Sequence, residues 1–275
     1  MGQSNPVRTS PGYTIWGGVR LPTMPTTLTA PLAGRQALIT GAASGIGAAT
    51  ARRLAEDGAR VILVARRADR LKALADEIGD QAVAIPADLT DRHAVEALAD
   101  RVNLKTVDLL VNNAAVMLPN PLIEGRDEEW RRMLDLNVSA VLHTTRTLLP
   151  SLQAAASAGR AADVVNVSST GADVPVSAFA VYGATKAALS YLSRALRVEL
   201  AATGLRVTDV KPGGVATELF EHTTHTGIRD RLASAVRSGK LLDPATVADA
   251  IAYAVSRPVG TCLSQLTVMP SAQPQ

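Results

Sequence analysis

The chain has 275 residues, of which 47% are hydrophobic and 19% charged, the composition of a globular protein rather than a disordered one. Aromatic residues make up only 3%, and the net charge of +3 comes from scattered arginines, which argues against nucleic-acid binding. The single cysteine, Cys262, excludes an internal disulfide and a cysteine-rich metal site. We expect no bound metal, a reducing cytoplasmic location and, because no apolar run approaches the roughly 20 residues of a membrane span, no membrane association.

Residues 1–33 are rich in Pro, Thr and Gly and show no hydrophobic period. This composition predicts a flexible extension ahead of one folded domain over residues 34–275. The segment before Val19 lacks the apolar stretch of a secretory signal peptide.

From Arg35 onward, short β-branched apolar runs alternate with amphipathic stretches. The runs predict strands at 36–40, 60–65, 82–86, 107–111, 163–168, 205–210 and 264–268. The stretches between them predict helices at about 45–57, 68–78, 91–101, 127–149, 180–202 and 244–256. Continuous apolar strands separated by helices are typical of a buried parallel sheet. We therefore expect an α/β fold: a doubly wound parallel sheet of seven strands with helices on both faces.

The first predicted strand runs into the glycine-rich segment TGAASGIG, which opens the first predicted helix. Gly41 suits the tight turn after the strand, Gly45 the close approach of the backbone to a pyrophosphate, and Gly47 the packing of the helix near the sheet. The helix N-terminus then offers N–H groups and partial positive charge to phosphates. This order of elements predicts a dinucleotide site; a glycine-rich turn without a ligand is the alternative.

The glycine spacing, G-x-x-x-G-x-G, resembles the short-chain dehydrogenase/reductase family in its compact, one-domain branch. The resemblance covers about residues 34–270 and implies a Rossmann-like fold, with Ser44 and Ile46 beside the cofactor. It also implies a homotetramer or homodimer joined through the helices at 127–149 and 180–202. Small residues on the second helix would allow close approach of two subunits: Ala184, Ala187, Ala188 and Ala195.

Two arginines follow the second predicted strand, at the place where an acidic residue would bind the ribose 2′-hydroxyl of NAD. A guanidinium group pairs well with a 2′-phosphate, so we predict NADP(H), with Arg66 as the main contact and Arg67 or Ser44 assisting. Ordinary surface charges are the alternative. After the third predicted strand, the resemblance implies that Asp88 bonds the adenine and Leu89 lines its pocket, although Asp88 is also suited to a turn or N-cap.

The catalytic candidates lie after the fourth predicted strand. Tyr182 and Lys186 are four residues apart, so they share one helix face. A nearby ammonium and an oxidised nicotinamide would lower the pKa of Tyr182, which could then act as general acid or base. Ser169, thirteen residues before Tyr182, matches the family spacing and would steady the substrate oxygen. The resemblance adds Asn137, which would hold a water linking Lys186 to solvent. For each residue alone, a satisfied buried polar group is the alternative.

Further cofactor contacts follow from the resemblance. The segment Asn112–Ala115 stands where the family usually has N-N-A-G, and the segment PGGVATEL follows the sixth predicted strand. The residues implied are Asn112, Ala114, Pro212, Gly213, Val215 and Thr217.

The segment at about 217–240 is the candidate substrate lid, because the chain there passes beside the reactive face of the nicotinamide. His222 and His225 within it, and Met117 and Val176 from neighbouring loops, are the candidate substrate contacts. A solvent-facing amphipathic helix is the alternative for this segment.

These residues predict an NADP(H)-dependent oxidoreductase that interconverts an aldehyde or ketone and an alcohol, acting as a reductase in a biosynthetic pathway. The C-terminal part is most similar to the group of clavulanate dehydrogenase and the NADP-dependent 3-hydroxy acid and serine dehydrogenases. Two alternatives remain open: reduction of a C=N or C=C bond on the same fold, and a non-catalytic scaffold that senses NADPH.

Overall fold

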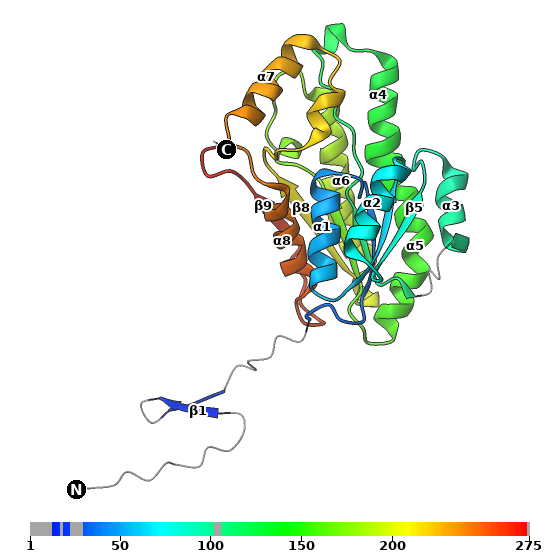
Figure 1. Ribbon diagram of the computed structural model, residues 1–275, viewed down its shortest axis with the longest axis vertical. Helices are drawn as coiled ribbons and strands as arrows, with labels where there is room; N and C mark the ends of the chain where they lie inside the picture. The colour runs from blue at the N-terminus through cyan, green and yellow to red at the C-terminus, as the bar shows by residue number, and fades with distance from the viewer. Residues whose placement is uncertain (1–12, 17–18, 23–29, 102–105, 274–275) are drawn as a thin grey trace, which may run out of the picture.

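The computed structural model describes residues 13–16, 19–22, 30–101 and 106–273 (Figure 1). Near the N-terminus, β1 (Tyr13–Trp16) and β2 (Val19–Pro22) pair as an antiparallel ribbon that the sequence did not predict. Most of the predicted flexible extension over 1–33 lies outside the described residues, so its flexibility stays a prediction.

Seven parallel strands form the central sheet in the order β5-β4-β3-β6-β7-β8-β9. Their bounds are β3 (Gln36–Thr40), β4 (Arg60–Ala65), β5 (Ala82–Pro86), β6 (Leu109–Asn112), β7 (Asp163–Val167), β8 (Arg206–Pro212) and β9 (Gln265–Val268). The chain starts in the middle at β3, winds to one edge and then returns through β6 to the other. The predicted doubly wound, Rossmann-like sheet in a single domain is thereby confirmed.

Helices cover both faces of this sheet (Figure 1). On one face lie α1 (Gly45–Glu56), α2 (Ala68–Ile78) and α8 (Pro244–Val255); on the other lie α3 (Arg92–Arg101), α5 (Ala140–Ser157) and α6 (Ala180–Glu199). Because strand side chains alternate, Leu38 packs with Leu152 in one core cluster and Ile39 packs with Leu54 in the other. In the described part of the chain, no helix is long and apolar enough to cross a membrane.

Two helical regions differ from expectation. The helix predicted at 127–149 is α4 (Asp127–Leu134), a π turn (η3, Asp135–Ser139) and α5, which continues past Pro150 because its apolar face packs on the sheet. The candidate lid contains the short helix η6 (Glu218–His222) and α7 (Thr226–Arg237), which had been only the alternative interpretation. Ile228 is the one buried residue of α7.

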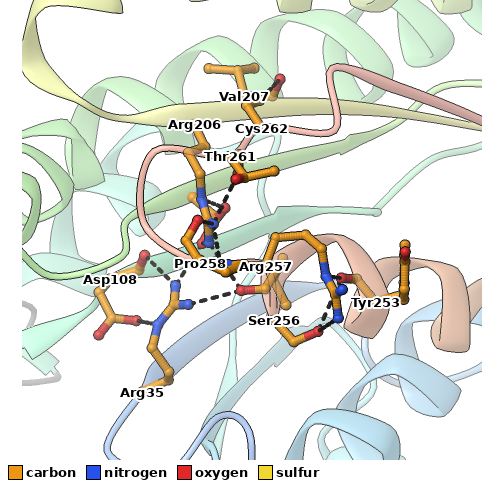
Figure 2. A network of polar contacts seen from close by, with 12 residues as sticks. Arg35, Asp108, Arg206, Val207, Tyr253, Ser256, Arg257, Pro258, Thr261 and Cys262 are labelled. Carbon is orange, nitrogen blue, oxygen red and sulfur yellow. Dashed lines mark hydrogen bonds and ion pairs between the residues drawn. The ribbon is translucent and has the colours of Figure 1, made fainter. Parts of the chain in front are cut away.

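Ion pairs connect the amino ends of the central strands, a region that we call the amino edge of the sheet (Figure 2). Arg206 donates to both carboxylate oxygens of Asp163 at 2.7 Å and to the carbonyls of four residues that end α8 or follow it: Val255, Arg257, Pro258 and Thr261. Arg35 donates to Asp108 at 2.6 Å and to Asp163 at 2.8 Å. The side chains of these four charged residues are all largely buried. Each of these two buried arginines is therefore paired with a buried carboxylate.

The opposite side of the sheet, where the strands have their carboxyl ends, is open. We call it the carboxyl edge, to distinguish it from the outer strands. The connections after β3 and β6, which are neighbours, lead to opposite faces of the sheet, because α1 covers one face and α5 the other. At such a switch point the loops diverge and leave a crevice, which is where ligands bind in open α/β sheets.

Candidate active site

One cavity of about 960 Å³ lies at this carboxyl edge, between the glycine loop, the ends of β4 to β8 and η6. It brings together most of the residues that the sequence predicted. Those that line it are Gly41, Ser44, Gly45, Ile46, Arg66, Arg67, Asp88, Leu89, Ala114, Met117, Ser169, Val176, Tyr182, Lys186, Pro212, Gly213, Val215, Thr217 and His222. Four predicted residues do not line it: Gly47, Asn112, Asn137 and His225.

The glycine loop adopts the conformation that its spacing predicts. Gly41 and Gly45 have positive φ angles of 68° and 53°, a region that favours glycine. A Cβ atom at Gly41 would lie 2.8 Å from the Cα atom of Ala114, so the loop and the end of β6 touch through backbone. Gly47 lies outside the cavity and has a packing role, because a Cβ there would collide with the carbonyl oxygen of Gly41. The first turn of α1 is left facing the cavity.

Asn113 holds this loop in place, a role that the sequence analysis missed. Its Nδ2 donates to the carbonyl of Thr40 at 2.9 Å, and its backbone N–H donates to Thr40 Oγ1 at 2.9 Å. Thr40 Oγ1 in turn donates to the carbonyl of Val111. These contacts join the loop after β3 to the end of β6, across the switch point. The doubled asparagine at 112–113 was the available signal.

Asn112 points away from the cavity. Its Nδ2 donates to Thr145 Oγ1 at 3.0 Å and to Asn166 Oδ1 at 2.9 Å, and its side chain is buried. It therefore holds the central strands to α5, as the resemblance implied, but its side chain does not reach the place expected for the cofactor ribose.

At the end of the cavity where the 2′-phosphate is expected, Arg67 is held by other side chains and Arg66 is not seen in such contacts among the described residues. Arg67 donates to Ser44 Oγ at 2.8 Å and to Glu218 Oε2 at 2.8 Å, whereas Arg66 is exposed. Glu218 also accepts from Arg70 at 2.5 Å. The hydrogen bonds from these two arginines lower the pKa of Glu218. A carboxylate of the candidate lid thus already contacts the arginine that a phosphate would use.

Asp88 forms the turn that was its alternative reading. Its Oδ1 accepts from the backbone N–H of Thr90 at 3.0 Å and from Thr90 Oγ1 at 2.7 Å. Burial works to raise the pKa of Asp88, but these hydrogen bonds and the charges of Arg66 and Arg132 outweigh it, so the pKa is lowered. Asp88 and the buried Leu89 line the cavity where the adenine was expected.

Tyr182, Lys186 and Ser169 meet at the inner end of the cavity. Lys186 Nζ lies 5.8 Å from the centre of the Tyr182 ring and donates to the carbonyl of Val167 at 2.8 Å. Ser169 Oγ accepts from the backbone N–H of Gly171 at 3.0 Å. Both Tyr182 and Lys186 are almost fully buried, on one face of α6. Ser169, Tyr182 and Lys186, which are separated in the sequence, therefore lie together in space.

Burial governs the protonation of both groups. It raises the pKa of Tyr182 to about 12, only partly offset by a hydrogen bond with Ser169. It lowers the pKa of Lys186 to about 8, opposed by the negative charge of Asp209. In the protein without cofactor, loss of hydration outweighs the hydrogen bond with Ser169. The lowering of the pKa of Tyr182 that we expect with an oxidised nicotinamide bound stays a prediction. A phenol that keeps its proton is suited to act as an acid.

Asn137 occupies the π turn and is fully buried. Its Oδ1 accepts from the N–H of Val116 at 2.8 Å, and its Nδ2 donates to the carbonyl of Val116 at 2.9 Å and to Thr185 Oγ1 at 3.1 Å. The side chain thus clamps the loop after β6 to α6 beside Lys186. These contacts engage both amide protons of the side chain. The water that Asn137 would hold between Lys186 and solvent stays a prediction.

The entrance next to Tyr182 is mainly apolar. Met117 and Tyr182 belong to a hydrophobic cluster, and Leu219 and Phe220 of η6 pack against it. His222 lines the cavity, but His225 does not. His225 caps α7 by accepting from the N–H of Ile228 at 3.3 Å, and its other ring nitrogen lies 3.5 Å from Glu124. His225 therefore lies outside the cavity, and its contact with a substrate stays a prediction.

Comparisons with known proteins agree with this geometry. Residues 35–227 match the family described as short chain dehydrogenase. An uncharacterized oxidoreductase of Staphylococcus haemolyticus is 36% identical over 242 residues, which are 87% of this chain and 98% of that protein.

Two solved structures share the fold, each with a TM-score of 0.77. The closed form of a serine dehydrogenase complexed with NADP⁺ is 30% identical and covers 87% of this chain and 96% of its own. A 3-ketoacyl-(acyl-carrier-protein) reductase from Brucella melitensis complexed with NADH is 33% identical and covers 87% of this chain and 98% of its own. The chain therefore belongs to the short-chain dehydrogenase family, as its glycine spacing predicted.

Proposed function

We propose that this protein is an NADP(H)-dependent oxidoreductase that interconverts a carbonyl and an alcohol, acting mainly as a reductase. The observation that carries the proposal is the single cavity with Ser169, Tyr182 and Lys186 at one end and Ser44 and Arg67 at the other. A cavity of about 960 Å³ with these two different ends suits a dinucleotide, whose phosphate end and reactive end need different chemistry.

The residues present fit the cofactor. The glycine loop and the first residues of α1, Gly45 and Ile46, line the cavity, where the N-terminus of the helix suits a phosphate. Arg67 and Ser44 would hold the 2′-phosphate, with Arg66 beside them. When bound, NADPH would supply the hydride. The serine dehydrogenase neighbour holds NADP⁺, which supports this choice; the reductase neighbour holds NADH.

In the proposed mechanism the substrate oxygen lies between Ser169 and Tyr182. Tyr182 donates its proton to that oxygen as negative charge develops on it, and the Ser169 hydroxyl, held by the N–H of Gly171, stabilises the same charge. Lys186 keeps a positive charge beside the resulting tyrosinate. Free Tyr182 is protonated at neutral pH, which is the form that carbonyl reduction requires at its start.

The apolar entrance supports a small substrate with an apolar portion, and His222 can hydrogen-bond a polar group on it. The segment at 217–240 would act as the lid, with η6 contributing Leu219, Phe220 and His222. Exchange of His222 for Ala should change KM, whereas His225→Ala should not. Hydrogen exchange should show stronger protection of the segment once NADPH and substrate bind; equal protection in both states would make it plain scaffold.

The decisive experiment follows NADPH absorbance with a panel of aldehydes, ketones, imines and activated alkenes. Oxidation of NADPH with aldehydes or ketones, lost in Tyr182→Phe, is the expected result. Turnover of only imines or alkenes would transfer the proposal to C=N or C=C reduction. Tight binding of NADPH without turnover of any class would favour a cofactor-sensing scaffold.

A homodimer or homotetramer is proposed through α5 and α6. Ala184, Ala188 and Ala195 are exposed on α6, and Tyr191 and Val198 on the same helix are 67% and 81% exposed. Exposed apolar side chains beside small ones suit close helix packing. Light scattering on the purified protein gives its mass directly; a monomer would contradict the proposal.

A further inference from the structure

A second group of buried charges lies directly behind the reactive end of the cavity. Asp209 and Lys211 are two residues apart on β8, so their side chains share one face of the sheet. Their side chains are 1% and 3% exposed, as buried as any apolar core residue. Buried charges are costly unless they are paired, so this group requires an explanation that the proposed chemistry has not given.

The contacts of Asp209 are with hydroxyl groups and an amine. Ser168 Oγ donates to Asp209 Oδ1, and Ser190 Oγ donates to Asp209 Oδ2 at 2.6 Å. Lys211 Nζ lies 3.9 Å from Asp209 Oδ2 and donates to Asp173 Oδ2 at 2.6 Å. Because Asp173 already neutralises Lys211 from the cavity side, the charge of Asp209 is only partly used by Lys211.

Asp209 also faces Lys186. Tyr182, Lys186 and Ser190 follow one another at intervals of four residues on α6, so they form a single stripe on one helix face. Ser190, at the end of this stripe, touches Asp209, and Ser168 bonds Asp209 from the strand next to it. Lys186, one turn before Ser190, donates to the carbonyl of Val167, the residue before Ser168, so both neighbours of its ammonium site bond the same carboxylate.

We propose that Asp209 is a positioning residue of this enzyme: a buried carboxylate that acts through Lys186, by supplying the counter-charge that keeps its ammonium protonated beside Tyr182. Within the part of the chain that the structure describes, the hydrogen bond of Lys186 is to the carbonyl of Val167, which carries no net charge. The charged or titratable groups packed around it are Tyr182 on its own helix, Asp209 and Lys211 on β8 and Asp173 after β7.

The sign of the effect follows from the charges. Burial lowers the pKa of Lys186 to about 8, and the negative charge of Asp209 limits that fall. Removal of the carboxylate charge leaves burial unopposed, so the amine loses its proton at lower pH. A partner charge at close range shifts a pKa by about one unit or more. The same residue thus determines whether Lys186 is charged in the neutral range.

The test is Asp209→Asn, which keeps the shape of the side chain and its ability to bond Ser168 and Ser190. Competitive labelling with acetic anhydride, with Lys186 acetylation measured by peptide mass spectrometry across a pH series, gives the midpoint of its titration without any substrate. We expect the midpoint to fall by at least about one pH unit. Although the proposal rests on the proposed function, this readout does not, so failure to find a substrate and failure of this inference are distinguishable.

The matched control is Ser190→Ala, which removes a hydrogen bond to Asp209 but leaves its charge. We expect its Lys186 midpoint to stay within about 0.3 pH unit of the wild type. If Asp209→Asn does not fold, the charge-balanced pair Asp209→Asn with Lys211→Gln replaces it, with a smaller but still measurable fall expected, because the positive charge of Lys211 is removed as well. An unchanged Lys186 midpoint in the folded variant, or an equal shift in Ser190→Ala, would overturn the proposal.

Once a substrate is known, the basic limb of kcat for carbonyl reduction should move to lower pH in Asp209→Asn by the same amount. A lower kcat at every pH with an unmoved limb would mean a purely structural role, and would also overturn the proposal.

Discussion

The two edges of the sheet use charge in opposite ways. At the amino edge, Arg206 donates to two carboxylate oxygens and four carbonyls, and Arg35 bridges two aspartates (Figure 2). At the carboxyl edge, Lys186 donates to one carbonyl, and Arg66 is exposed beside an open cavity. Both edges contain buried cations, but among the described residues Lys186 at the carboxyl edge forms no ion pair, whereas Arg35 and Arg206 at the amino edge each bond a carboxylate and carbonyls. Charges that the protein satisfies hold strands together, whereas charges that it leaves available can act on a ligand.

The largest expected effect is a loss of stability from a substitution in the ion-pair network of the amino edge. Arg206→Met keeps most of the side-chain volume but leaves Asp163 without its main partner, and loss of one member of a buried ion pair costs about 3–5 kcal/mol. We expect the free energy of unfolding, measured by urea denaturation, to fall by this amount, while turnover per folded molecule stays near that of the wild type.

The control for that prediction is Arg52→Met. Arg52 pairs with Glu77, but both side chains are about half exposed, so their ion pair contributes only about 0–1 kcal/mol. Equal losses of stability in the two variants would show that burial of the amino-edge network adds nothing.

The next largest effect is a loss of turnover from a substitution at the carboxyl edge that leaves the fold intact. Tyr182→Phe removes only the hydroxyl, and the loss of a general acid lowers turnover by at least about 10²-fold. Thermal unfolding and NADPH fluorescence titration should match the wild type. Turnover within a few-fold of the wild type would remove Tyr182 from its role.

A smaller effect tests the two arginines against each other. Arg67→Ala should weaken NADPH binding by roughly 10- to 100-fold, the contribution of a charge-assisted hydrogen bond, while NADH affinity stays almost unchanged. Because Arg66 is exposed and Arg67 is bonded to Ser44, Arg66→Ala should have the smaller effect. Titration of both variants with both cofactors decides, and the reverse order would restore Arg66 as the main contact.

The smallest effect concerns the lid. Glu218 competes with a phosphate for Arg67, through an ion pair whose partners are both about one-third exposed. Such a pair contributes about 0–1 kcal/mol, so Glu218→Gln should tighten NADPH binding by up to about fivefold and leave NADH affinity unchanged. Glu221→Gln, a neighbouring carboxylate, is the control. Weaker NADPH binding in Glu218→Gln would mean that Glu218 orients Arg67 instead of competing.

Much of the fold was predictable because its signals are local. The strands at 36–40, 60–65 and 82–86 have the predicted bounds, since each is a short apolar run between turn residues. The helix at 127–149 was less predictable. Proline usually ends a helix, but packing of Leu152 and Ala155 on the sheet carries α5 beyond Pro150 to Ser157. The π turn that places Asn137 likewise has no local sequence signal.

The sequence by itself determined the glycine loop, the order of strands and helices and the spacing of Ser169, Tyr182 and Lys186, because turn chemistry and periodicity depend on near neighbours in the chain. Only the tertiary structure decided which side chains face the cavity. It turned Asn112 inward and His225 away, and it brought Glu218 to Arg67 and Asp209 to Ser190, one helical turn after Lys186. It also raised the pKa of Tyr182 in the protein without cofactor, because hydration is lost only when distant segments pack around the ring.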